Sequence, residues 1–184
     1  MARTLGKRPG GVCREGVLIL VTVGGQLPFD RLIEHVDRWA AGGETPVFAQ
    51  IGQSDFVPAH MEYAKLLPGL EFQRMVDECD AIVAHAGMGT ILTALEQRKP
   101  LLIYPRLAEK GEHRNDHQIA TARYFAERGL VRAAFDEAEL ERELSRLHEF
   151  RPSEGISPFA SDELITRIRG FVFPEEAASQ DEES

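Results

Sequence analysis

Short apolar runs, each followed by a glycine or polar turn and then by a helical pattern, constrain the fold of this chain more than any other feature. The first run, residues 17–23, is continuous and rich in β-branched residues, which is typical of a strand buried on both faces. Gly24 and Gly25 end this run, and apolar residues then recur at helical spacing over residues 29–40. The segment therefore predicts a strand, a glycine turn and a helix.

The same alternation continues along the chain. It predicts strands at residues 46–51, 70–72, 80–84, 101–104 and 130–133, helices at residues 59–66, 90–98, 116–128, 137–150 and 162–171, and a single helical turn at residues 75–79. Such alternation indicates an α/β fold in which right-handed βαβ units build a parallel sheet covered on both faces. Ligands of such sheets bind beyond the carboxyl ends of the strands. We therefore expect function at residues 24–30, 50–55, 72–75, 85–90 and 104–118.

Composition narrows the class of protein. The 184 residues include 21 Lys and Arg against 30 Asp and Glu, a formal net charge of −9, and no basic cluster, which argues against nucleic acid as a partner. The longest apolar run has seven residues, whereas a membrane-spanning helix needs about 20. Residues 1–15 are expected to form a flexible basic arm and residues 175–184 an acidic disordered tail, which leaves residues 16–174 as one domain. Cys13 and Cys79 have neither metal-ligand nor disulfide-framework spacing, so we expect free thiols in a reducing compartment.

Residues 85–90, with the sequence His-Ala-Gly-Met-Gly-Thr, form the most informative segment because they lie between a predicted strand and a predicted helix. The N–H groups of Gly87, Gly89 and Thr90 are expected to be free at a helix N-terminus, where glycine lets a phosphate approach the backbone. A tight turn that needs glycine only for its dihedral angles explains the spacing equally well. The P-loop pattern and the third glycine of the dinucleotide fingerprint are absent, which disfavours ordinary triphosphate and nicotinamide sites.

Residues 109–118 are the second candidate, because charged and amide side chains gather there in a composition suited to hydrogen-bonding a polyhydroxylated ligand. His113 and His117 are four residues apart, which leaves a metal site as a less favoured alternative. Lys110 and Arg114 would oppose a cation there, and a solvated loop is a further alternative. Residues 24–30 are a weaker candidate, since a turn in which Pro28 starts a helix explains them more simply.

The order of these motifs resembles the donor-binding C-terminal domain of family 28 glycosyltransferases of GT-B fold. The motifs are residues 21–24 with 28–33, residues 85–90, residues 99–100, and residues 105–106 with 111–118. The resemblance spans about residues 17–131 and is closest to small stand-alone members, namely bacterial exopolysaccharide subunits of PssE or EpsF type and the soluble subunit of the dolichol-linked GlcNAc transferase. It implies a Rossmann-like parallel sheet, the C-terminal half of a GT-B fold.

The resemblance also implies roles for single residues. His85 would donate to a phosphate as the catalytic residue, and the UDP-sugar would be bound by Gly24, Gly25, Phe72, Gln73, Gly87, Met88, Gly89, Thr90, Glu96, Arg106, Asp116, His117 and Gln118. Phe72 and Gln73 correspond to the uracil site, and residues 116–118 to the segment that contacts the donor sugar. Many relatives carry a ribose-binding glutamate where this chain has Thr93, and Glu96 on roughly the same helix face is the candidate replacement.

The implied reaction is inverting transfer of a hexosyl group from a UDP-sugar to a polyprenyl-diphosphate-linked sugar in exopolysaccharide synthesis, with no metal or other cofactor. A membrane-associated partner subunit is expected to bind the acceptor, because 184 residues do not also hold an acceptor domain. This implies a cytoplasmic protein, peripheral at the inner face of the membrane through its partner. A non-catalytic module that binds a nucleotide sugar or a partner is the alternative. Arg106, Lys110 and Arg114 would suit the carboxylate of a glucuronate donor.

Overall fold

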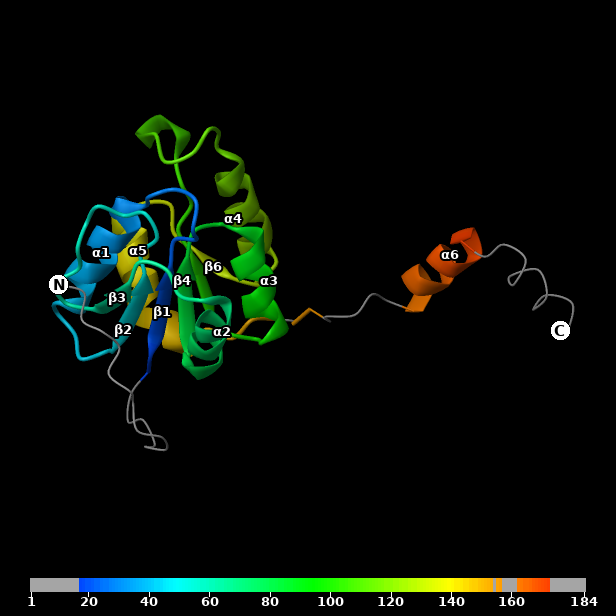
Figure 1. The fold of residues 1–184 in the computed structure, drawn as a ribbon, viewed down its shortest axis with the longest axis horizontal. Coiled ribbons are helices and arrows are strands. Elements are labelled where there is room, and N and C mark those ends of the chain that lie inside the picture. Colours follow the sequence, from blue (N-terminus) through cyan, green and yellow to red (C-terminus); the bar gives the residue numbers. More distant parts are fainter. Residues whose placement is uncertain (1–16, 154, 157–161, 173–184) are drawn as a thin grey trace, which may run out of the picture.

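The computed structural model describes residues 17–153, 155–156 and 162–172 and contains one six-stranded sheet. The strands are β1 (Ile19–Thr22), β2 (Val47–Gln50), β3 (Glu62–Ala64), β4 (Ala81–Ala84), β5 (Leu101–Ile103) and β6 (Arg132–Ala133). All neighbouring strands are parallel, in the order β3-β2-β1-β4-β5-β6 (Figure 1). The predicted α/β class with a Rossmann-like parallel sheet is confirmed.

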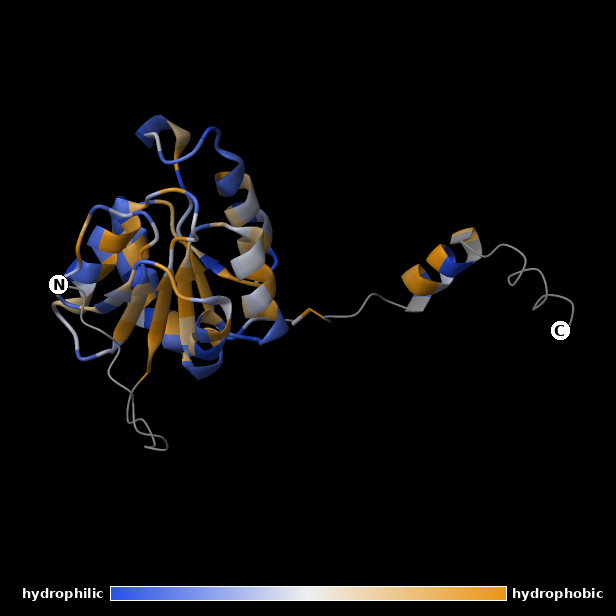
Figure 2. Ribbon diagram, in the orientation of Figure 1, coloured by the Kyte–Doolittle hydropathy of each residue, from blue (hydrophilic) through white to orange (hydrophobic). Residues whose placement is uncertain are grey.

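Helices cover both faces of the sheet. α1 (Asp30–Ala40) and α5 (Glu137–Arg146) pack on one face, and α2 (Gly69–Glu78), α3 (Met88–Glu96) and α4 (His117–Glu127) pack on the other. Successive strand residues alternate between these two cores: Ile19 and Val21 join the first, whereas Leu18 and Leu20 join the second. This two-sided burial explains why the strands are continuous apolar runs, drawn orange in Figure 2. The remaining elements are the 3₁₀ turns η1 (Ala108–Lys110) and η2 (Leu147–Glu149), and α6 (Asp162–Val172).

The segment between β2 and β4 differs from the prediction. The prediction of a helix at residues 59–66 is wrong, because residues 62–64 form the edge strand β3, which pairs with β2. Asp37 accepts hydrogen bonds from the N–H groups of Ala59 and His60, and this fixes the approach to β3 outside a helix. The prediction of a strand at residues 70–72 is also wrong, because these residues belong to the helix α2, which begins directly after Pro68. The helical turn predicted at residues 75–79 is the last part of this helix, whose C-cap is Cys79.

The strand order reverses between β1 and β4, and this reversal positions the site. The connections that leave β1 and β4 run to opposite faces of the sheet, and ligands of such sheets bind at the carboxyl ends of the strands at this reversal. Thr22 of β1 is in register with Ala84 of β4, which places Gly24 beside His85. The arm and tail expected at residues 1–15 and 175–184 lie outside the described residues. Within the described part, no helix has the length and apolar character required to span a membrane.

Candidate functional site at the reversal of strand order

The imidazole of His85 lies between two glycines at the reversal point. A Cβ added to Gly24 would stand 3.0 Å from His85 Cε1, and one added to Gly87 would stand 2.7 Å from the same atom. Gly24 also has φ of 75°, which side chains other than that of glycine rarely adopt. Both glycines therefore make room for the histidine ring, which is a role that their spacing in the sequence did not reveal.

The backbone at the start of α3 is open in front of this ring. Ile91 donates the first N–H of the helix, to the carbonyl of Gly87, so the N–H groups of Met88, Gly89 and Thr90 precede the helical ladder. Gly89 has no heavy atom within 4 Å of the position that a Cβ would occupy. The expectation that the Gly87 N–H is free is wrong, because this group donates to the carbonyl of His85 at 2.8 Å. The open amide cluster therefore consists of residues 88–90.

The surroundings keep His85 neutral. Burial lowers its pKa to about 4, with further lowering from the charges of Arg106 and His113, while the backbone of Thr22 opposes the shift. Nδ1 is buried and makes no hydrogen bond of good geometry, although Thr22 lies close enough to affect the pKa. A neutral imidazole still carries one N–H donor, and an anion bound beside it would favour a second proton.

Gln118 connects the turn after β4 with the loop after β5. It is 4% exposed, and its Oε1 accepts the N–H groups of Ala86 at 3.2 Å and Arg106 at 3.1 Å. These two donors identify the oxygen side of the amide, so Nε2 is the side that remains available as a donor. Within the described residues no hydrogen bond is recorded for Nε2. The buried amide thus presents a fixed donor at the carboxyl edge of the sheet.

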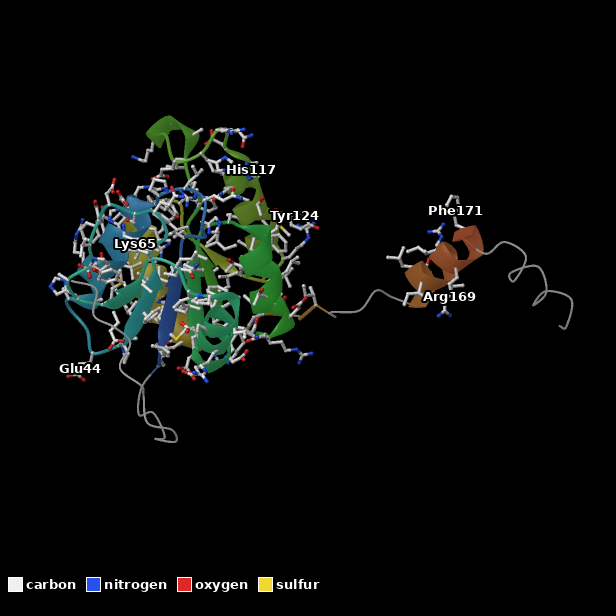
Figure 3. All side chains as sticks on the ribbon, viewed as in Figure 1. Glu44, Lys65, His117, Tyr124, Arg169 and Phe171 are labelled. Carbon is white, nitrogen blue, oxygen red and sulfur yellow. The ribbon has the colours of Figure 1, made fainter. Side chains whose placement is uncertain are left out.

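Three further side chains of residues 105–118 lie at this edge. Asp116 accepts the N–H of Ala108 at 2.8 Å, and His117 lies beside Asn115 at the first turn of α4. The rings of His113 and His117 meet edge to face with centroids 4.6 Å apart. Figure 3 shows His117 at the end of the molecule opposite Glu44, which lies near the amino ends of the strands. The structure therefore brings residues 116–118 to the same edge as the glycine turns.

A match to the sequence model of a protein family identifies the family of this domain. The model of the glycosyltransferase family 28 C-terminal domain matches residues 18–158. The chain belongs to this family. No curated protein sequence gave a significant match.

Solved structures agree with a family 28 domain of GT-B type. The glycotransferase of kitacinnamycin aligns with a TM-score of 0.57 and 24% identity over 79% of this chain and 37% of its own. MurG of Acinetobacter baumannii aligns with a TM-score of 0.52 and 22% identity over 73% of this chain and 42% of its own. ALG13 aligns with a TM-score of 0.54 and 19% identity over 84% of this chain and 95% of its own. Because these identities are below 25%, the likeness concerns the fold. The family 28 domain spans about two fifths of the length of the first two proteins and nearly all of ALG13.

Glu96 does not join the other site residues of the family 28 domain. It is the last residue of α3, seven positions after Gly89, which corresponds to about 10 Å along the helix axis. The suggestion that Glu96 replaces the carboxylate missing at Thr93 is therefore not supported by its position. Thr93 lies nearer to the amide cluster, and its hydroxyl donates to the carbonyl of Gly89 at 2.9 Å.

Phe72 and Gln73 lie in the first half of α2. The ring of Phe72 is half-buried against the core below α2, α3 and α4. Gln73 donates to Asp77 on the next turn, and Asp77 also accepts from Gln97 at the end of α3, so Gln73 points along α2 away from the carboxyl edge. The side chain nearest to Gly25 is instead Leu66, whose Cδ1 would lie 3.8 Å from an added Cβ.

Arg106 has a different environment from the one expected. Its side chain is 2% exposed, and its guanidinium donates to the backbone carbonyls of Val23, Leu27 and Pro28. These carbonyls occupy the donors that were expected to bind the sugar or a uronate carboxylate. We therefore correct its role from ligand binding to support of the turn after β1. Of the three basic residues expected near a glucuronate, Lys110 and Arg114 remain exposed.

Sequence reasoning considered His113 only as a possible metal ligand and gave no role in nucleotide binding to Arg31 or Glu112, although all three lie at this site. The signal was present, since Arg31 belongs to the motif at residues 28–33 and the other two belong to residues 111–118. Among the described residues, no group of three or more His, Cys, Asp or Glu side chains is arranged to hold a metal ion. A cavity of about 380 Å³ lies at the amino ends of the strands, bordered by Val17 and Pro46, and contains none of the candidate site residues.

Proposed function

We propose that this domain binds a UDP-sugar at the reversal point of the sheet and acts as the donor half of an inverting glycosyltransferase. The observation that carries the proposal is the open amide cluster of residues 88–90 beside the neutral ring of His85. The N–H groups at a helix N-terminus attract a pyrophosphate, and they stabilise the charge that develops on a departing UDP. Membership in a glycosyltransferase family supports the same chemistry.

In this proposal each part of the site has a distinct task. The amide cluster and the Thr90 hydroxyl bind the pyrophosphate, His85 donates to a phosphate oxygen, and Gln118 Nε2 with residues 116–117 contacts the sugar. Gly25 and Leu66 border the same opening. Charge stabilisation is assigned to fixed N–H groups and not to a metal or other cofactor. The general base is assigned to the acceptor side.

We further propose that a membrane-associated subunit supplies the acceptor site and that the acceptor is a polyprenyl-diphosphate-linked sugar, as in exopolysaccharide synthesis. The support is that the domain corresponds to about two fifths of the length of the kitacinnamycin glycotransferase and of MurG but to nearly all of ALG13. The domain would then work in the cytoplasm, at the inner face of the membrane through its partner.

Calorimetric titration of the purified chain with UDP tests the donor site, with Gly89→Asp as the variant in which a carboxylate enters the amide cluster. We expect binding by the wild type and none by Gly89→Asp. Absence of binding by the wild type would refute the proposal. Titration with UDP-glucose, UDP-N-acetylglucosamine, UDP-galactose and UDP-glucuronate then identifies the sugar.

A second function is favoured by one observation, the absence of a carboxylate near the amide cluster on α3. Thr93 holds the expected position and Glu96 lies about 10 Å away along the helix. A domain that binds a nucleotide sugar or a partner without catalysis accommodates this difference. Sugar transfer by a reconstituted pair of subunits, abolished by His85→Ala, would eliminate this alternative.

A further inference from the structure

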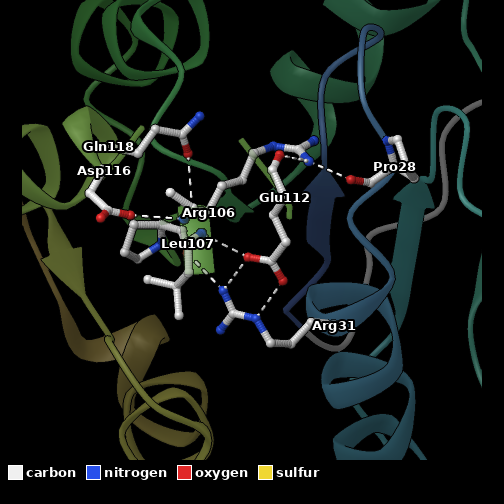
Figure 4. A network of polar contacts seen from close by, with 9 residues as sticks. Pro28, Arg31, Arg106, Leu107, Glu112, Asp116 and Gln118 are labelled. Carbon is white, nitrogen blue, oxygen red and sulfur yellow. Dashed lines mark hydrogen bonds and ion pairs between the residues drawn. The ribbon is translucent and has the colours of Figure 1, made fainter. Parts of the chain in front are cut away.

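A network of charged side chains joins the loop after β5 to the loop after β1 and the first turn of α1 (Figure 4). Arg31 donates through Nε to Glu112 Oε1 at 2.7 Å and through Nη2 to Glu112 Oε2 at 2.8 Å. Nη2 also donates to the carbonyl of Pro105 at 2.9 Å. The side chains of Arg31 and Glu112 are 15% and 11% exposed, so this two-point pair is largely shielded from water.

Arg106 forms the other half of the network. Its Nη2 donates to Val23 at 2.9 Å and to Leu27 at 2.8 Å, and its Nη1 donates to Pro28, in each case to the backbone carbonyl. These carbonyls enclose the turn that contains Gly24 and Gly25. The Arg106 guanidinium also lies 4.6 Å from the centre of the Phe29 ring. The buried cation thus holds the turn after β1 at several points.

Glu112 connects the two arginines through the β5 loop. Besides Arg31, it accepts the N–H of Leu107 at 2.8 Å, and its own backbone carbonyl lies 3.4 Å from Arg106 Nη1. The adjoining part of the loop leads to residues 116–118 at the site. A long loop of this kind requires specific contacts to hold one conformation.

We propose that Arg31, Glu112 and Arg106 are positioning residues, which fix the β5 loop and the glycine turn after β1 in the arrangement that binds the nucleotide. The inference rests on the proposed function, because it concerns the affinity of that same site. Stability alone does not account for the network, since apolar residues of similar volume often replace buried ion pairs without loss of stability. The contacts instead lie between the two loops that border His85.

Two measurements on the full chain test this inference. The variants are Arg31→Met, Glu112→Gln and their combination, and the control is Arg38→Met. Arg38 is on the same helix and pairs with Glu137, but both side chains of that pair are more than half exposed. UDP binding is measured by calorimetry, and hydrogen exchange is followed at the amides of Leu107 and Ala108.

We expect each single variant to bind UDP at least tenfold more weakly than the wild type, and the combination to be no weaker than the more affected single variant. Hydrogen exchange at the amides of Leu107 and Ala108 should accelerate at least tenfold in these variants, whereas exchange in β4 should match the wild type. Arg38→Met should match the wild type in both UDP affinity and exchange rates. Arg31→Lys, which retains the charge but not the two-point geometry, should recover part of the affinity. If Arg31→Met does not fold, Glu112→Gln preserves side-chain shape and provides the same readout.

The possible failures are distinguishable. If the wild type binds UDP and both single variants bind within twofold of it, the positioning role is overturned while the proposed function stands. If the wild type binds no UDP, the proposed function fails, and the exchange rates alone then decide whether the network orders the loop. Unchanged exchange at Leu107 and Ala108 in both variants overturns the inference in either case.

Discussion

Replacing Gly89 with alanine should make the protein more stable and at the same time weaken nucleotide binding. Gly89 is the second residue of α3, its φ is not positive, and no heavy atom lies within 4 Å of an added Cβ. The methyl group therefore enters open space in the free protein. Alanine is favoured over glycine in helices by up to about 1 kcal/mol, and less near the ends, so we expect a gain of about 0.5 kcal/mol. For a domain of this size the gain raises Tm by roughly 1–2 °C.

The same methyl group occupies the approach to the amide cluster. If it removes one hydrogen bond between a backbone N–H and a charged phosphate, the loss is about 1.5–3 kcal/mol, which corresponds to roughly a 10- to 150-fold weaker affinity. Thermal unfolding without ligand and calorimetry with UDP measure the two effects separately. Gly43→Ala is the matched control, because Gly43 follows α1 at the opposite end of the strands and an added Cβ would meet only Thr45 N at 3.9 Å.

The opposite signs of the two effects distinguish this prediction from a general defect. A variant that lost both stability and binding would indicate that the space around Gly89 is not open. Wild-type affinity in a variant with increased stability would refute the assignment of the amide cluster to the pyrophosphate. Only increased stability with weakened UDP binding, absent from Gly43→Ala, agrees with the geometry.

Four further predictions concern the same site. Gly87→Ala should lower Tm and displace the His85 ring, because the new Cβ would stand 2.7 Å from Cε1, and the histidine resonances in NMR spectra would report the displacement. The pKa of His85 is lowered to about 4 in the folded protein, so the unfolded chain binds more protons between pH 4 and 6.5. The free energy of unfolding should therefore fall as the pH decreases through this window. Urea unfolding should show a smaller fall between pH 7 and pH 5 for His85→Gln than for the wild type. A bound pyrophosphate should raise this pKa, so calorimetry at pH 5.5 in two buffers should show more proton uptake on UDP binding for the wild type than for His85→Gln. Gln118→Leu leaves the N–H groups of Ala86 and Arg106 without their acceptor and should cost about 1–3 kcal/mol in urea unfolding, whereas a cost near zero would contradict the connecting role of this amide.

The sheet was predictable because its central strands are buried on both faces and therefore leave continuous apolar runs in the sequence. β1 and β4 show this pattern, with every residue buried. The edge strand β3 does not, since it has three residues and none is buried. α2 was predicted only in part, as a helical turn at residues 75–79, and Val76 is its only buried residue. Both errors thus concern elements with at most one buried residue, and β3 in addition depends on its pairing with β2.

The convergence of the candidate segments at one edge of the sheet was predictable, but the contacts of each side chain were not. Parallel topology places the residues that follow β1, β4 and β5 at one edge, and the sequence alone supports that step. The partners of a side chain depend on distant residues: Arg106 donates to Val23, 83 positions earlier, and this contact leaves no local pattern. Similarly, the space beside Gly87 is filled by a ring two positions away, which only the turn geometry reveals.

These contacts also explain how an acidic chain could hold an anionic nucleotide. The buried cations at the site are already engaged, Arg31 by the carboxylate of Glu112 and Arg106 by backbone carbonyls, so neither is available to a phosphate. In the proposed function the oriented N–H groups at residues 88–90 attract the pyrophosphate without adding to the net charge of −9, and the exposed Lys110 and Arg114 lie on the loop after β5. His85 complements these N–H groups, because it is neutral without a ligand and gains a proton most readily when an anion lies beside it. The positive charge of the site would then depend on the presence of the nucleotide, which spares the free protein an unpaired buried cation between β1 and β4.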